Sequence, residues 1–144
     1  MKSTLKLTAA LLCLQLLAIT AFAQDIQKAF TGIWELAQAG ANGQALQNSP
    51  PGYLKIFNDS TFANVQVRNT GSVISHGGRF LVNDSQNYTE TALYRLPEMT
   101  GGPLGKGFHL KYLFSEDRKQ LTITFTLESG IESGIALTEI WRRL

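Results

Sequence analysis

Two carboxylates and the aromatic residues beside them are the groups in this sequence best suited to contact a small molecule. Glu90 lies in a β-branched segment where every second residue shares a face, so we expect it to share a face with Tyr88 and Tyr94. The same alternation places Glu139 on one face with Trp141. If these faces point inward, both carboxylates are partly buried and need hydrogen-bond partners.

Arg143, on the face of Glu139, and the tyrosine hydroxyls could supply those partners. Two interpretations stay open: an internal hydrogen-bond network that holds the fold in shape, or a polar floor that orients the head group of a ligand. The strand aromatics leave a similar choice, because they are numerous enough either to fill a small interior or to line a pocket. The candidate ligand-binding residues are Tyr88, Glu90, Tyr94, Tyr112, Phe125 and Glu139.

Metal and nucleophilic chemistry find little support in the sequence. His76 and His109 fall in different predicted strands, and there is no His-x-x-x-His and no Asp-rich loop. No Gly-x-Ser-x-Gly motif occurs, and segment 101–107 lacks the first glycine and the hydroxyl residue of a phosphate loop. Gly77 and Gly78 indicate a bulge or a sharp strand bend. The sequence therefore predicts no metal and no cofactor, and it assigns no catalytic residue.

Short β-branched and aromatic runs, separated by Asn, Asp, Ser and Gly, favour an all-β fold after a helical turn at 25–30. No other segment has a helical period long enough to connect parallel strands, so we expect an antiparallel up-and-down order. The eight predicted strands are 31–38, 52–57, 61–68, 73–82, 87–96, 107–115, 120–127 and 135–143.

The connections between these strands alternate in length, which predicts one closed end and one end fringed by long loops. Eight strands can close into a barrel that holds side chains or one small ligand, and closure removes the exposed edges. A two-sheet sandwich is the alternative. The odd-numbered connections, expected to be long, are 39–51, 69–72, 97–106 and 128–134, and the tight turns are 58–60, 83–86 and 116–119.

The chain has 144 residues, of which 44% are hydrophobic and 17% charged, as expected for one globular domain. Residues 1–23 have the three parts of a signal peptide: a basic start, an apolar run at 7–20, and Ala21-Phe22-Ala23 before the cleavage point. A membrane anchor is the alternative, but the run contains polar residues and is short for a spanning helix.

Removal of residues 1–23 leaves a domain at 24–144 that has no cysteine and equal numbers of basic and acidic residues. We therefore expect a secreted or periplasmic protein that is stabilised by its core and not by disulfides. The neutral balance argues against nucleic acid as a partner recruited by bulk charge, and no integral membrane segment is expected after cleavage.

Gly32-Ile33-Trp34, at the start of the first predicted strand, resembles the signature of lipocalins and related calycins. The ending Glu139-Ile140-Trp141-Arg142-Arg143 strengthens the resemblance. The chain is most similar to small secreted bacterial lipocalin-like domains of unknown function, also over segments 54–59, 78–80 and 88–90. The longer signature after the tryptophan and the helix after the barrel, which many lipocalins have, are absent from this sequence.

This resemblance implies an eight-stranded up-and-down lipocalin-like barrel in which a late basic residue packs over the signature tryptophan at the closed end. Arg143 is the first candidate for that role and Arg142 the second. The structural signature residues are Gly32, Trp34, Trp141 and Arg143.

The function that follows is non-covalent binding of a small, largely apolar molecule through the long-loop end of the barrel. One alternative is a filled barrel whose loops 39–51 and 97–106 grip a protein or envelope partner. Another is a small isomerase or hydrolase, since calycin-like barrels occasionally host chemistry. A cavity above Trp34 separates the first two, and a strongly raised pKa at Glu90 or Glu139 facing an open pocket would favour the enzyme.

Overall fold

The computed structural model describes residues 25–99, 103–127 and 133–144. The predicted signal peptide at 1–23 lies outside the described residues, as do parts of connections 97–106 and 128–134. A helix at 25–30 precedes the strands. The strands are β1 (Gly32–Ala41), β2 (Gln47–Asn48), β3 (Tyr53–Asn58), β4 (Thr61–Arg68), β5 (Gly71–Val82), β6 (Asn87–Arg95), β7 (Gly107–Phe114), β8 (Gln120–Thr126) and β9 (Ala136–Arg143).

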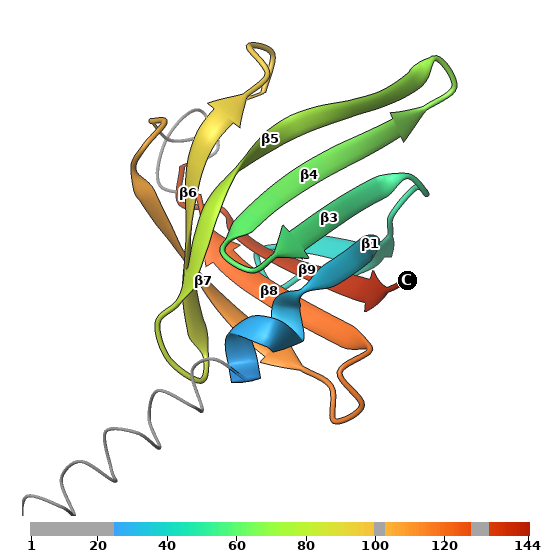
Figure 1. Cartoon of the computed structure of the whole chain (residues 1–144). Coiled ribbons are helices and arrows are strands. Elements are labelled where there is room, and N and C mark those ends of the chain that lie inside the picture. Colours follow the sequence, from blue (N-terminus) through green and yellow to red (C-terminus); the bar gives the residue numbers. More distant parts are fainter. Residues whose placement is uncertain (1–24, 100–102, 128–132) are drawn as a thin grey trace, which may run out of the picture.

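The strands form one antiparallel sheet that closes on itself (Figure 1). Its order is β1-β3-β4-β5-β6-β7-β8-β9, and β1 pairs with β9 from Trp34↔Arg143 to Ala41↔Leu137. The two-residue strand β2 lies beside β1 within the first long connection. The predicted eight-stranded up-and-down barrel with a short N-terminal helix is therefore confirmed, and the alternative of two separate sheets is wrong.

One predicted loop length is wrong. β5 begins at Gly71, two residues before the predicted strand, and its first residues pair with the end of β4. Only residues 69 and 70 remain between β4 and β5, so this odd-numbered connection is a tight hairpin and not a long loop. The hairpin extends past the neighbouring strands at the end of the barrel opposite the helix (Figure 1).

An aromatic cluster fills the end of the barrel where the helix lies. Phe30, at the end of the helix, is fully buried, and its ring contacts Phe57 at 5.1 Å and Tyr112 at 4.9 Å between centroids. The edge-to-face geometry of these pairs is the arrangement that aromatic rings favour. Gln27 fixes the helix to the tight turns by donating to the Asp59 carbonyl at 2.6 Å. This end of the barrel is therefore closed by side chains.

Arg143 and Trp34 join the first strand to the last at this closed end. The guanidinium carbon lies 4.2 Å from the centroid of the buried indole. Its nitrogens donate to the carbonyls of Thr31 (2.8 Å) and Ala29 (2.5 Å), while the indole N–H donates to the Phe30 carbonyl at 2.8 Å. Arg143 therefore stacks on the indole, caps backbone carbonyls and, through its pairing with Trp34, helps to fix the register between β1 and β9.

Gly32 is required beside this arginine for two reasons. Its φ of +140° lies in a region that side chains rarely adopt, and a Cβ there would lie 2.9 Å from Arg143 Nη1. Of the two arginines considered from the sequence, Arg143 occupies this position. Arg142 points outward and pairs with Glu35 at 2.7 Å.

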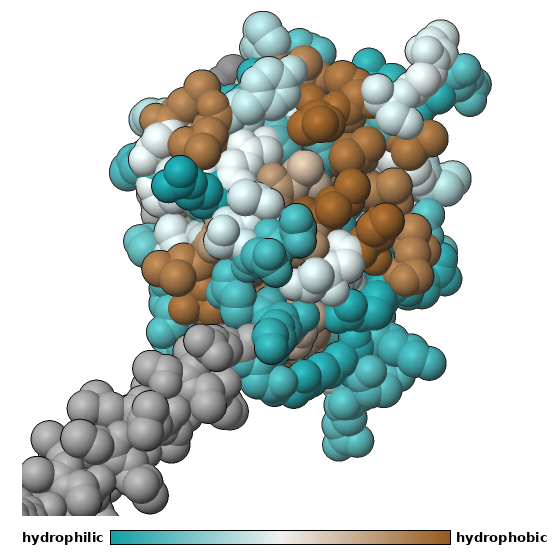
Figure 2. All heavy atoms as spheres, in the orientation of Figure 1, coloured by the Kyte–Doolittle hydropathy of each residue, from teal (hydrophilic) through white to brown (hydrophobic). Residues whose placement is uncertain are grey.

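The outer surface is uneven in polarity. Figure 2 shows apolar side chains gathered over the strands β3 to β5, whereas polar side chains surround the helical end. Val67 and Ile74 are about half exposed, and Tyr53 is 41% exposed. We call the end of the barrel opposite the helix the wide end.

We expect Trp34→Ala to lower the free energy of unfolding by about 3–5 kcal/mol, because it empties the space of a fully buried ring and leaves Arg143 without its stacking partner. Urea unfolding monitored by circular dichroism measures this change. The matched control is Ile33→Ala, at an exposed neighbouring residue, which should cost under about 1 kcal/mol. Equal losses in the two variants would contradict the placement of Trp34 in the core.

Candidate ligand cavity

A cavity of about 520 Å³ occupies the interior of the barrel above the aromatic cluster. Its walls include Leu36, Phe62 and Leu137, with Phe108 and Phe125 in edge-to-face contact. Met99, Pro103 and Lys106, from the connection between β6 and β7, lie at its mouth. The interior is therefore not filled by side chains, and its volume lies within the roughly 300–1,000 Å³ typical of small-molecule sites.

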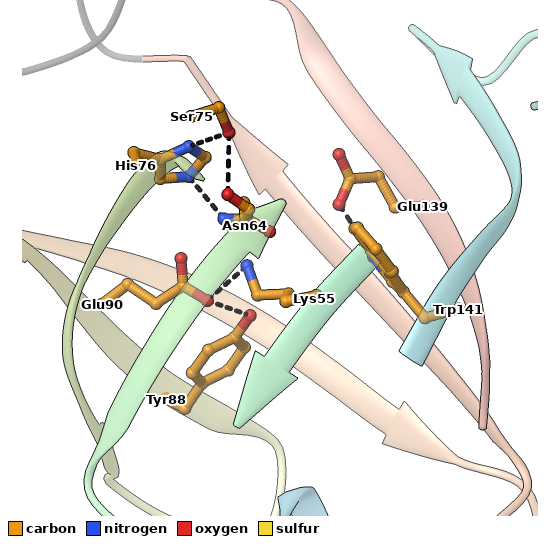
Figure 3. Close-up of polar contacts among 8 residues, drawn as sticks. All are labelled: Lys55, Asn64, Ser75, His76, Tyr88, Glu90, Glu139 and Trp141. Atoms are coloured by element: carbon orange, nitrogen blue, oxygen red, sulfur yellow. Dashed lines mark hydrogen bonds and ion pairs between the residues drawn. The ribbon is translucent and has the colours of Figure 1, made fainter. Parts of the chain in front are cut away.

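A buried ion pair lies in the floor of this cavity and joins two strands that are not neighbours in the sheet. Lys55 Nζ, from β3, lies 2.7 Å from Glu90 Oε1, from β6, and the two side chains are only 5% and 8% exposed. Tyr88 donates its hydroxyl to the same oxygen at 3.1 Å. Figure 3 shows these three side chains pointing toward one another. Each buried charge thus has a partner, as a low-dielectric interior requires.

The aromatic side chains around Lys55 also stabilise its charge. Its ammonium lies 5.1 Å from the ring centroid of Phe62, 5.5 Å from that of Phe57 and 5.8 Å from that of Trp141. The pKa of Tyr88 is raised well above its usual value, first by burial and then by the nearby carboxylates Glu90 and Glu139. Tyr88 therefore acts as a neutral hydrogen-bond donor.

Glu139 and Trp141, on β9, line the same cavity. The indole N–H of Trp141 donates to Glu139 Oε2 at 3.0 Å, which orients the carboxyl group (Figure 3). Burial raises the pKa of Glu139, while Lys55 and the indole hydrogen bond oppose that rise and Glu90 adds to it. Glu139 is partly exposed to the cavity and is available as a polar contact for its contents.

A second polar cluster lies on the wall formed by β4 and β5, and its members form hydrogen bonds with one another. His76 Nε2 lies 2.6 Å from Asn64 Nδ2, and Ser75 Oγ lies 3.3 Å from His76 Nδ1 and 3.2 Å from the Asn64 carbonyl. An amide nitrogen can only donate, so Nε2 accepts and Nδ1 carries the proton of the neutral ring. The three groups then form a closed ring of hydrogen bonds.

This ring of hydrogen bonds depends on a neutral histidine, since a proton on Nε2 would face the amide N–H. Burial lowers the pKa of His76 to about 4, with further contributions from the charges of Lys55 and Arg95. Both Ser75 and His76 line the cavity because a bulge at this point places two residues of β5 opposite one of β4.

The structure brings together only part of the predicted ligand-binding set. Glu90, Phe125 and Glu139 line the cavity. Tyr88 is fully buried and is linked to the floor through its hydroxyl group. Tyr112 is buried in the aromatic cluster, where its hydroxyl donates to the Asp84 carbonyl of a closed-end turn at 2.9 Å.

The expectation that Tyr94 shares a face with Tyr88 and Glu90 is wrong, because a bulge interrupts β6. Gly77 pairs with Tyr94 and Gly78 with Ala92, so Leu93 is an extra residue that reverses the alternation. Tyr94 is consequently half exposed. The predicted bulge at the glycines is confirmed. The two backbones approach so closely here that a Cβ at Gly78 would lie 2.0 Å from the Thr91 carbonyl oxygen, so the position requires glycine.

Sequence reasoning missed Lys55 and Arg95, which both line the cavity. Lys55 alternates with Tyr53 and Phe57, but the intervening Leu54 and Ile56 are apolar as well, so the pattern does not distinguish the inner face. Arg95 faces inward only because of the bulge at Leu93. Within 25–99, 103–127 and 133–144, no group of three or more His, Cys, Asp or Glu residues is placed to hold a metal ion.

The closed antiparallel barrel, its short N-terminal helix and its internal cavity define a lipocalin-like fold. Comparisons with solved structures agree. The chain is similar to a lipocalin-like protein from Bacteroides uniformis, with a TM-score of 0.55 and 16% identity over 81% of this chain and 99% of that one. It is also similar to an uncharacterized protein from Bacteroides eggerthii, with a TM-score of 0.55 and 12% identity over 80% of this chain and 99% of that one. At these identities the likeness shows the fold.

The chain belongs to the family described as a domain of unknown function, DUF4488, whose model matches residues 29–144. The match covers the helix end and the whole barrel. No curated protein matches the chain. Among the helical residues that the structure describes, none belongs to a helix long and apolar enough to cross a membrane.

We expect Lys55→Met to lower the free energy of unfolding by about 3–5 kcal/mol, because it leaves the Glu90 carboxylate buried without its ammonium partner. The double variant Lys55→Met with Glu90→Leu should recover most of this loss, since it removes both charges together. Urea unfolding at pH 7 measures both. A double variant less stable than the single one would contradict the pairing.

His76 should titrate near pH 4 in the folded protein, against about 6.5 when unfolded. Because the unfolded chain takes up the proton first, this contribution to stability is complete above pH 6.5 and is lost as the pH falls toward 4. The loss reaches about 3 kcal/mol. Histidine ring NMR follows the titration directly, since the chain has only two histidines.

The matched variant for the histidine prediction is His76→Gln, whose unfolding free energy should fall less than that of the wild type between pH 6.5 and 4. Parallel pH profiles for the two proteins would show that His76 is not buried in its neutral form.

Proposed function

We propose that this protein binds a small, largely apolar molecule non-covalently inside its barrel, and that it does so after export, in the periplasm or outside the cell. The observation that carries the proposal is the cavity of about 520 Å³ between the aromatic cluster and the wide end of the barrel. The sequence supports export through the signal peptide predicted at 1–23.

The walls of the cavity supply the binding energy in this proposal. Apolar side chains predominate in the upper cavity, from Leu36 and Phe62 to Phe125 and Leu137. Burial of roughly 300 Å² of apolar ligand surface at about 25 cal/mol per Å² contributes about 7 kcal/mol before the entropy cost of association. The polar groups in the floor are few, which suits orientation of a ligand better than recognition of a highly charged one.

The cavity does not fit the alternative of a filled barrel that acts only through its loops. A small isomerase or hydrolase is the second candidate, and one observation favours it: the carboxyl group of Glu139 faces an open cavity with a raised pKa. Among the described residues, however, no nucleophile is hydrogen-bonded to that carboxyl group. Binding without chemistry is therefore the simpler proposal.

Two measurements test the binding proposal. Native mass spectrometry of protein purified from its own host should show a retained small molecule. Titration with the uncharged dye Nile red should show saturable binding at one site per chain. Ala92→Phe, which introduces a ring into the cavity wall, should weaken dye binding at least about tenfold.

The matched control is Leu113→Phe, which places the same ring on the exposed outer side of β7. This variant should bind the dye as the wild type does. Equal binding by both variants, each confirmed as folded by thermal unfolding, would place the dye outside the barrel and contradict the proposal.

A further inference from the structure

We propose that the floor of the cavity recognises an uncharged hydrogen-bond donor, such as the hydroxyl group of an otherwise apolar ligand, and that Glu139 is the residue that accepts this hydrogen bond. The inference rests on the proposed binding function and specifies the ligand class. It follows from how the polar groups of the floor use their hydrogen-bonding capacity among themselves.

The ion pair in the floor weakens the attraction of the floor for a charged head group. Lys55 and Glu90 are 2.7 Å apart and almost fully buried, so each already neutralises the other. A charged head group placed there would face the ammonium of Lys55 together with the carboxylates of Glu90 and Glu139, so a head group of either sign would meet a like charge. The other two cationic residues of the lining, Arg95 and Lys106, come from the end of β6 and from the connection that follows it. A head group of either charge would lose its hydration on entering a site that already contains a group of the same charge.

The cluster on the wall formed by β4 and β5 uses most of its hydrogen-bonding groups among its own members. The amide of Asn64 donates to His76, the ring of His76 donates to Ser75, and the hydroxyl of Ser75 donates to the Asn64 carbonyl. A ligand that entered this ring of hydrogen bonds would have to replace a bond that already exists. The ring of hydrogen bonds leaves only the second N–H and the oxygen of the Asn64 side-chain amide for a ligand.

Glu139 differs from Glu90 in its exposure: the contacts of each carboxyl group engage one oxygen, but Glu90 is almost fully buried, whereas Glu139 is partly exposed to the cavity. In the described part of the chain its hydrogen bond engages Oε2, through Trp141, and the residue lines the cavity with part of its surface exposed. The indole N–H holds the carboxyl group in one orientation, so the second oxygen is positioned before a ligand arrives. An oxygen in this environment is a strong acceptor for a donor that brings no charge.

The test uses two isomers that differ only in the donor: 1-undecanol and 1-methoxydecane. Isothermal titration calorimetry measures both against the full-length mature protein at pH 7. The wild type should bind the alcohol at least about tenfold more tightly than the ether, because a site built to accept a hydrogen bond rejects the analogue that lacks the donor.

Glu139→Leu should reduce this preference to less than about twofold while the affinity for the ether stays within about threefold of the wild type. Glu139→Gln, which keeps a side-chain oxygen and provides a test if the leucine variant does not fold, should retain a preference for the alcohol. The matched control is Glu35→Leu, the same change at an outward-facing residue of β1, which should leave the preference intact.

The outcomes separate the two proposals. If the wild type binds both isomers equally, the assignment of Glu139 is overturned and the binding function stands. If the preference for the alcohol persists in Glu139→Leu, the hydrogen-bond acceptor is another group and the assignment is equally overturned. If neither isomer binds, the proposed function itself fails together with this inference.

Discussion

Closure of the barrel at its closed end, where the helix lies, is the constraint on which the rest of the structure depends. The sheet closes where β1 meets β9, and at that point Arg143 stacks on the buried indole of Trp34 and caps the carbonyls of Thr31 and Ala29. The contact fixes the helix end, the first strand and the last strand in one register. Without that register, Glu139 and Trp141, four and two residues before Arg143, would not face the interior.

The two ends of the barrel differ in how side chains fill them. Rings in edge-to-face and tilted contact fill the helical end, where Phe30 alone meets five other aromatic rings. The wide end keeps its aromatic residues on the wall, as with Phe108 and Phe125, and leaves the centre open. The open half is the part of the barrel that the proposed ligand would occupy.

The fold could be predicted largely from the sequence, whereas the cavity could not. Period-two alternation, tight polar turns and the pair of residues Gly32 and Trp34 are local signals, and they were sufficient for eight antiparallel strands and a closed end. The inner face of β3 is not a local signal, because Leu54 and Ile56 are as apolar as the residues that point inward. Lys55 was therefore missed, although it carries the buried ion pair.

Bulges explain the errors at Tyr94 and Arg95 and also shape the site. Each bulge adds one residue to a strand, so every side chain beyond it changes face. The bulge at Leu93 turns Tyr94 outward and Arg95 inward, and the bulge at Ser75 brings both Ser75 and His76 to the cavity wall. The glycines at 77 and 78 indicate where the irregularity falls but not which strand contains the extra residue. The polar residues of the cavity wall are thus set by strand register, which depends on contacts between strands and not on the pattern within one strand.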